Sequence, residues 1–187
     1  MKNLILLTSI LYFSITFSQE LGTRPIVWFS TTDISIERNS GTDVYFNKRN
    51  KKRLNFKHAI FLERTVPTDT PIKSFYDFIV EEGNFKNGYK DGLWKTTYEN
   101  KLVKTENYNN GLMVGRYRVY NTDGVMLYKT TFGSQGDGKY QDSHYPTGVI
   151  KEDGFYKNGV KDGEWCTYDE KGRIVESTIY KDGVIQK

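Results

Sequence analysis

The chain has 187 residues, with 27 Lys and Arg against 23 Asp and Glu, so its formal net charge at pH 7 is only +4. This small excess is a weak argument for a polyanionic partner, and the single cysteine, Cys166, excludes an intrachain disulfide framework. The length fits one domain or a repeat array with a capping region. The 17 Gly, 14 Tyr and 11 Phe favour β-structure over helix.

Residues 1–18 have the pattern of a secretory signal peptide. Lys2 gives a basic start, an apolar stretch runs from Leu4 to Phe17, and Thr16 and Ser18 are small residues typical of a cleavage site. The stretch is shorter than the roughly 20 apolar residues of a bilayer span. We expect cleavage near Ser18/Gln19 and export to the periplasm or the medium. The alternative is an uncleaved N-terminal anchor.

Residues 19–71 are predicted to form an N-terminal β-rich region that begins the sheet and caps the repeats after it. Terminal units of repeat proteins differ from the others because they close an open end. A turn is expected at 39–43, and two prolines at 67 and 71 indicate a loop over 66–71. The expected strands are residues 24–30, 34–37, 44–46 and 54–62.

The densest cluster of charge in the chain lies between residues 48 and 57. A basic run of this kind is typical of contact with phosphate, and export favours lipid headgroups over nucleic acid. We therefore consider an anionic membrane surface as a partner and expect no nucleic acid. The alternative is a solvated hairpin connection whose lysines block edge-to-edge pairing. The residues concerned are Lys48, Arg49, Lys51, Lys52, Arg53 and Lys57.

Residues 72–187 form a tandem repeat. Residues 83–94 recur as residues 154–165 at a spacing of 71, with weaker copies between them. A fixed period of 20 to 50 residues indicates stacked supersecondary units that cannot bury their surfaces alone. A step of 24 residues separates the aromatic positions Tyr108, Phe132, Tyr156 and Tyr180, and also Gly124, Gly148 and Gly172.

Each unit is predicted to be a β-hairpin, and neighbouring hairpins to join into one long antiparallel meander sheet. The first strands are expected at 93–98, 116–120 and 164–168, and the return strands at 125–132, 149–156 and 174–180. Turn chemistry is expected at residues 86–88 and 91–92. The third unit has Gln135 and Gln141 where other units have Gly and Trp, and His144-Tyr145-Pro146 interrupts its strand. We expect a bulge or loop there.

Aromatic residues are predicted on both faces of this sheet, where they either contact a partner or pack the sheet itself. Residues three apart on a strand lie on opposite faces, which separates Tyr120 from Tyr117 and Tyr168 from Trp165. The candidate partner-binding residues are Trp94, Tyr98, Tyr117, Tyr120, Trp165 and Tyr168.

The array resembles MORN-repeat variants, relatives of the "membrane occupation and recognition nexus" repeat. The resemblance covers roughly residues 79–187 and rests on residues 156–172 and 85–98, with a weaker match at 108–124. It implies an all-β scaffold of hairpin repeats. Such variants occur in bacterial proteins, including an antitoxin family, so the resemblance also allows an antitoxin or immunity-type inhibitor of one specific protein.

Catalytic patterns are not found. His58 and His144 lie in different regions outside any metal-ligand spacing, and Cys166 lacks a local catalytic signature. The carboxylates at 81–82 and 152–153 occupy equivalent repeat positions, which indicates solvated positions and not a catalytic pair. We expect no enzyme, cofactor or metal. The predicted function is an exported scaffold that binds a protein or cell-envelope component through its sheet surface.

Overall fold

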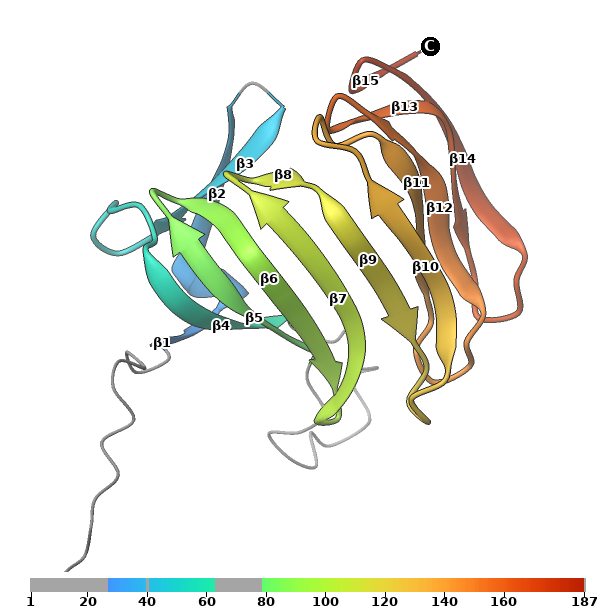
Figure 1. Cartoon of the computed structure of the whole chain (residues 1–187), viewed down its shortest axis with the longest axis horizontal. Coiled ribbons are helices and arrows are strands. Elements are labelled where there is room, and N and C mark those ends of the chain that lie inside the picture. Colours follow the sequence, from blue (N-terminus) through green and yellow to red (C-terminus); the bar gives the residue numbers. More distant parts are fainter. Residues whose placement is uncertain (1–26, 40, 63–78, 187) are drawn as a thin grey trace, which may run out of the picture.

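The computed structural model describes residues 27–39, 41–62 and 79–186 (Figure 1). The predicted signal peptide and the loop at 66–71 lie outside the described residues. The described elements are the 3-10 helix η1 (Thr31–Asp33) and the strands β1 (Val27–Ser30), β2 (Ile34–Asn39), β3 (Thr42–Asn47), β4 (Phe56–Leu62), β5 (Ile79–Lys86), β6 (Tyr89–Tyr98), β7 (Lys101–Asn109), β8 (Leu112–Met113), β9 (Gly115–Tyr120), β10 (Met126–Phe132), β11 (Gly138–Ser143), β12 (Ile150–Lys157), β13 (Val160–Tyr168), β14 (Ile174–Lys181) and β15 (Val184–Ile185).

The strands form two open sheets and one separate hairpin. The first sheet has the order β1-β4-β5-β6-β7-β9-β10, with β8 beside β7, and the second has the order β11-β12-β13-β14-β15. The two strands of the β2–β3 hairpin pair with each other and belong to neither of these sheets. The all-β class and the antiparallel hairpins are therefore confirmed. Within residues 27–62, only β1 and β4 belong to the first sheet, because β4 pairs antiparallel with β5 and β1 parallel with β4.

The predicted antiparallel meander is divided between two sheets, because the hydrogen-bonded ladder stops after β10. The chain turns at Gly133, whose N–H donates to Asp137 O at 2.8 Å, and β11 opens a new sheet (Figure 1). This is the start of the unit with irregular sequence. A register shift between Asp142 and Ser143 adds a bulge, as expected there.

Strand β6 is longer than predicted. Residues 91–92 were expected to form a turn, but Gly92 adopts a φ of +72° inside β6, and the register with β5 shifts beside it. A glycine in the left-handed region lets a strand absorb extra residues as a bulge while pairing continues. Gly163 has the same role in β13, with a φ of +75°.

Each tryptophan of the 71-residue repeat lies against a glycine of the preceding strand. A Cβ at Gly83 would lie 2.3 Å from Trp94 Cδ2, and one at Gly154 would lie 2.3 Å from Trp165 Cδ2. The indole Nε1 donates to a carbonyl in both copies, Trp94 to Asn84 O and Trp165 to Phe155 O, each at 3.1 Å. The glycine is required because any side chain there would occupy the space of the ring.

A second repeated device joins each turn to the unit before it. The backbone N–H of Asn110 donates to Asp91 Oδ1, that of Asn158 to Asp137 Oδ1, and that of Asp182 to Asp162 Oδ1. Asn87 N–H donates in the same way to Asn55 Oδ1 at 2.8 Å. The repeat therefore extends back into β4. Phe56, with a φ of +74°, occupies the position of Gly92, and His58 occupies the position of Trp94.

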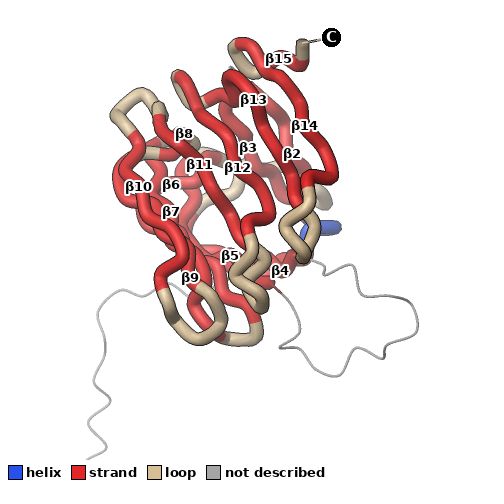
Figure 2. Tube along the Cα trace, turned by 90° about the vertical axis from the view of Figure 1, so that its right-hand side faces the viewer, coloured by secondary structure: helices blue, strands red, loops and turns tan. Residues whose placement is uncertain are grey.

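Two hydrophobic clusters form the interior of the part of the chain that the structure describes. The smaller one consists of Ile34, Leu54, Ile60, Phe85 and Trp94, and lies between the β2–β3 hairpin and the first sheet. The larger one spans both sheets, because Tyr117 of β9 lies 5.3 Å from Tyr140 of β11, which stacks on Trp165 at 5.5 Å. Its buried members are Tyr98, Val103, Tyr117, Val119, Phe132, Tyr140, Tyr145 and Trp165. Figure 2 shows the two sheets from the side.

Replacing Gly83 by alanine is expected to destabilise the fold by about 1–3 kcal/mol, the range for overpacking a filled core. The new methyl group would overlap the Trp94 ring. The control is Gly133→Ala, whose added Cβ would meet its nearest neighbour at an ordinary 3.7 Å. Urea unfolding followed by tryptophan fluorescence measures both variants. Equal unfolding midpoints would contradict the requirement for a glycine under the ring.

Candidate binding site

Four of the six predicted partner-binding aromatics are buried in the core. Tyr117, Trp94, Trp165 and Tyr98 are 0%, 1%, 3% and 7% exposed. The prediction that these four residues contact a partner is therefore wrong. They pack the sheets, because the face that carries the tryptophans is turned toward the interior. The alternative stated for these residues, that they pack the sheet, is the one that the structure supports.

Tyr120 and Tyr168 are the other two members of the set, and both are half-buried. They occupy the same repeat position, three residues after Tyr117 and Trp165, at the ends of β9 and β13. The Tyr168 hydroxyl donates to Asp153 Oδ1 at 2.9 Å. These two side chains reach solvent in part and stay candidates for partner contact.

A lysine lies over each of Trp94 and Trp165, buried in the first case and half-buried in the second, and sequence reasoning missed both. Lys90 Nζ is 4.3 Å from the Trp94 ring centroid and 5.3 Å from that of Tyr108. Lys161 repeats this over Trp165 at 3.9 Å and Tyr180 at 5.5 Å. Cation–π contacts gain strength when they are removed from water, so this pair of units has an electrostatic as well as an apolar core.

Each of these lysines is paired with a glutamate of the preceding strand. Lys90 Nζ lies 2.8 Å from Glu81 Oε2, and Lys161 Nζ lies 2.6 Å from Glu152 Oε1. The expectation that Glu81 and Glu152 are simply solvated is therefore wrong. Burial alone would lower the pKa of Lys90, but the Glu81 carboxylate outweighs it and the pKa is raised. The sequence does contain a signal for this arrangement, because Glu81, Lys90 and Trp94 each recur 71 residues later.

A second ionic group links the two sheets. Lys104 of β7 lies 3.5 Å from Glu106 Oε1 and 3.7 Å from Asp142 Oδ2 of β11, and all three side chains are buried. Burial opposes the charge on Lys104, yet the carboxylates of Asp142 and Glu106 raise its pKa well above the ordinary value. The Tyr145 hydroxyl also donates to Asp142 Oδ2, at 3.4 Å. These contacts connect β7 to β11 and so fix the distance between the two sheets.

Most of the predicted basic cluster is brought together on one exposed loop between β3 and β4. Lys48, Arg49, Lys51, Lys52 and Arg53 are exposed, and none of these five forms an ion pair with a described residue. Asn47 Oδ1 shapes the loop by accepting the N–H groups of residues 49 and 50. Lys57 is separate from this loop because it pairs with Glu82 at 2.7 Å.

The two histidines do not share a site. His58 is buried, with its ring stacked on Phe29 at 5.3 Å, and burial lowers its pKa. His144 Nε2 lies 2.9 Å from Tyr168 O. Among the residues that the structure describes, no three His, Cys, Asp or Glu side chains are placed to hold a metal ion. In the same part of the chain, no helix has the length and apolar character to cross a membrane.

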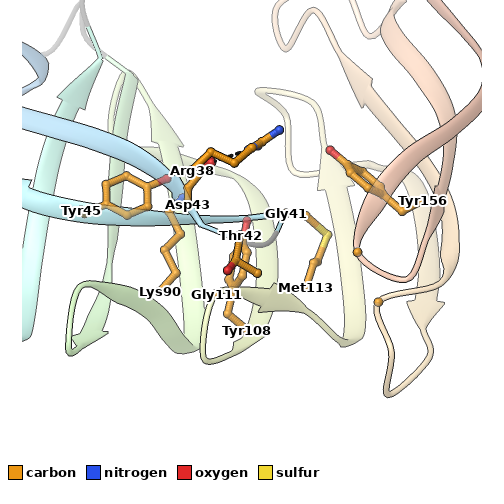
Figure 3. Close-up of a pocket in the computed structure, with 12 residues that line it drawn as sticks. Arg38, Gly41, Thr42, Asp43, Tyr45, Lys90, Tyr108, Gly111, Met113 and Tyr156 are labelled. Carbon is orange, nitrogen blue, oxygen red and sulfur yellow. Dashed lines mark hydrogen bonds and ion pairs between the residues drawn. The ribbon is translucent and has the colours of Figure 1, made fainter. Parts of the chain in front are cut away.

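A cavity of about 120 Å³ lies where the β2–β3 hairpin meets both sheets (Figure 3). Sequence reasoning did not identify it, because the residues around it come from segments more than 100 positions apart. Its walls include Arg38, Tyr45, Lys90, Tyr108, Met113 and Tyr156.

Removing one partner of the buried ion pair is expected to be far more damaging than removing its exposed neighbour. Glu81→Gln leaves the Lys90 charge buried and uncompensated, and should cost about 3–5 kcal/mol of unfolding free energy. Glu82→Gln breaks only the partly exposed pair with Lys57, which is worth less than about 1 kcal/mol. Urea unfolding compares the two variants. A Glu81→Gln midpoint as high as that of Glu82→Gln would contradict the burial of a charged Lys90.

One comparison with known proteins identifies a family resemblance within the array. Residues 161–182 match the MORN repeat variant. A search of curated proteins found no match. The matched segment contains Lys161, Trp165 and Tyr180, whose arrangement recurs at Lys90, Trp94 and Tyr108. The matched segment and the unit at Lys90 therefore share one arrangement of lysine and aromatic rings, and the match supports a resemblance of residues 161–182 to the MORN repeat variant.

Proposed function

We propose that the protein is an exported, non-catalytic repeat scaffold that binds a partner protein along the open edge of its last repeat. The repeat family supports a scaffold, since MORN repeats often serve protein or membrane binding. Export rests on the signal-peptide pattern of residues 1–18. The geometry of the second sheet supports the position of the binding surface.

The observation that carries this proposal is that most of the outer edge of β14 is not paired with a described strand. Beyond β13, its pairing with β15 reaches only Tyr180 and Lys181, and the Gln186 N–H donates to Ile179 O at 2.8 Å, so the outer edge of residues 174–178 has no described strand beside it. An edge of this kind presents unpaired N–H and C=O groups that can accept another strand. Exposed apolar side chains accompany it, namely Ile174, Val175, Ile179, Val184 and Ile185.

The lysine–glutamate ion pair of the last repeat is also more exposed to solvent than that of the first. The Lys90–Glu81 side chains are 8% and 16% exposed, whereas those of Lys161 and Glu152 are 29% and 28% exposed. In the first sheet, further strands cover the unit on both sides, but in the second sheet only β14 and the short β15 follow it. A partner strand added to β14 would complete the burial of this unit. Tyr168, which pairs with Ile174, lies beside the same edge.

Affinity capture with the tagged chain from extracts of the producing cell tests this proposal. We expect one stoichiometric protein partner, lost when Ile174 and Ile179 are both replaced by lysine, because charges on an edge strand oppose pairing. The control is Val125→Lys, an equally exposed position in the turn between β9 and β10. A partner that the edge variant retains would place binding elsewhere. The partner's identity would separate envelope assembly from inhibition of a toxin.

We propose an anionic membrane surface as a second candidate partner, contacted by the β3–β4 loop. The specific observation in its favour is that the five basic side chains of this loop are exposed and form no ion pair with any residue that the structure describes. Each such charge near an anionic bilayer contributes about 1 kcal/mol. Export leaves phospholipid headgroups as the anions within reach.

Sedimentation with phosphatidylglycerol vesicles measures this contact. We expect binding that falls as salt increases, and that is lost when Lys48, Arg49, Lys51 and Lys52 are replaced by glutamine. The control replaces four exposed lysines of the sheets, Lys129, Lys139, Lys151 and Lys157, and so removes the same charge. An equal loss in both variants would show only a response to net charge and would contradict a role for the loop.

A further inference from the structure

The cavity under the β2–β3 hairpin has the features of a binding site that neither the repeat nor the edge strand explains. The hairpin forms its roof: Tyr45 N–H donates to Gly88 O at 2.7 Å, and a Cβ at Gly41 would lie 2.7 Å from Val160 Cγ1. The roof is thus attached to the first sheet and touches the second. The cavity lies between them (Figure 3).

Three tyrosines supply polar groups to this cavity without using them in the fold. Tyr45, Tyr108 and Tyr156 line it, and their hydroxyls have no hydrogen-bond partner among the described residues. Other tyrosines of the core do have one, since the Tyr117 hydroxyl donates to Gln141 O and that of Tyr128 to Lys139 O. Figure 3 shows Tyr45 and Tyr156 at opposite ends of the group, with Tyr108 and Met113 between them.

The charges of the cavity are already balanced. Arg38 pairs with Asp43 at 2.9 Å and Lys90 with Glu81 at 2.8 Å. An ionic ligand would have to compete with one of these pairs. Burial raises the pKa of Tyr45, Tyr108 and Tyr156, so each hydroxyl stays neutral and can both donate and accept a hydrogen bond. The walls therefore suit an uncharged ligand with several hydroxyl groups.

Size and shape restrict the ligand further. A cavity of about 150 Å³ accommodates benzene, so about 120 Å³ takes only part of a sugar ring, and the rest of the ligand would lie at the opening. Aromatic rings and the Met113 thioether offer apolar surface to the C–H faces of such a ring. Gly111 and Gly136 line the cavity with positive φ and add no side chains to fill it.

We propose that this cavity binds a single sugar ring, either a free monosaccharide or the exposed end of a glycan. The three phenol hydroxyls would exchange hydrogen bonds with the sugar hydroxyls, and Met113 and the aromatic rings would pack on its C–H face. The site is separate from the edge of β14. Sugar binding and partner capture can therefore succeed or fail independently.

Saturation-transfer NMR on the full chain tests the proposal with four probes. They are methyl β-D-glucopyranoside, N-acetyl-D-glucosamine, cellobiose and N,N′-diacetylchitobiose. We expect saturable binding of at least one probe, with a dissociation constant on the order of 1 mM. Tighter binding of a disaccharide than of its monosaccharide would indicate a glycan end, and equal binding a free sugar. Both results support the site.

Variants that remove one hydroxyl each locate the binding. Tyr108→Phe and Tyr156→Phe should weaken it about fivefold, the loss expected for one hydrogen bond, whereas Tyr180→Phe, outside the cavity, should not change it. Thermal unfolding confirms that each variant is folded. The proposal is overturned if no probe binds the folded chain, or if both cavity variants bind like the wild type. Saturable binding of inorganic phosphate in place of every saccharide would also overturn it.

Discussion

The structure depends on the contact between a tryptophan ring and a glycine of the strand before it. The ring closes on Gly83 or Gly154 so tightly that even a methyl group would overlap it. A lysine also lies over the ring and is neutralised by a glutamate, as in Lys90 with Glu81. A sheet with a thin apolar interior can bury a charge in this way, because the ring and the carboxylate together replace the water that the ammonium group loses.

The same unit explains why a break in the hydrogen-bonded ladder does not separate the molecule into two parts. Tyr117, Tyr140 and Trp165 continue the row of rings from the first sheet into the second. Lys104 and Asp142 add an ionic contact across the break. Side-chain packing takes over where backbone pairing stops. The irregular third unit is therefore a joint between sheets, and its departures from the repeat, at Gln135 and Gln141, fall where the ladder ends.

The β2–β3 hairpin has a different role from the repeats. It adds no strand to either sheet, but Val44 is buried and Tyr45 is bonded to the turn at Gly88, so the hairpin is anchored across the repeats. The cavity exists because the hairpin spans the sheets without filling the space beneath it. The exposed edge of β14 and the basic loop lie elsewhere on the surface. The fold thus separates three surfaces with different chemistry, which suits a scaffold.

The sequence by itself determined the period, the β-hairpins and the place of irregularity, because glycine turns and aromatic spacing are local signals. It also contained the 71-residue spacing of Glu81, Lys90 and Trp94, although their contact shows only when strands pair. Tertiary structure alone decided which aromatics are buried. The face of a strand follows from alternation, but which face is interior depends on how the sheets curl. The hidden repeat at Asn55–His58 and the cavity likewise depend on contacts between distant segments, since Phe56 and His58 replace the residues that mark the repeat elsewhere.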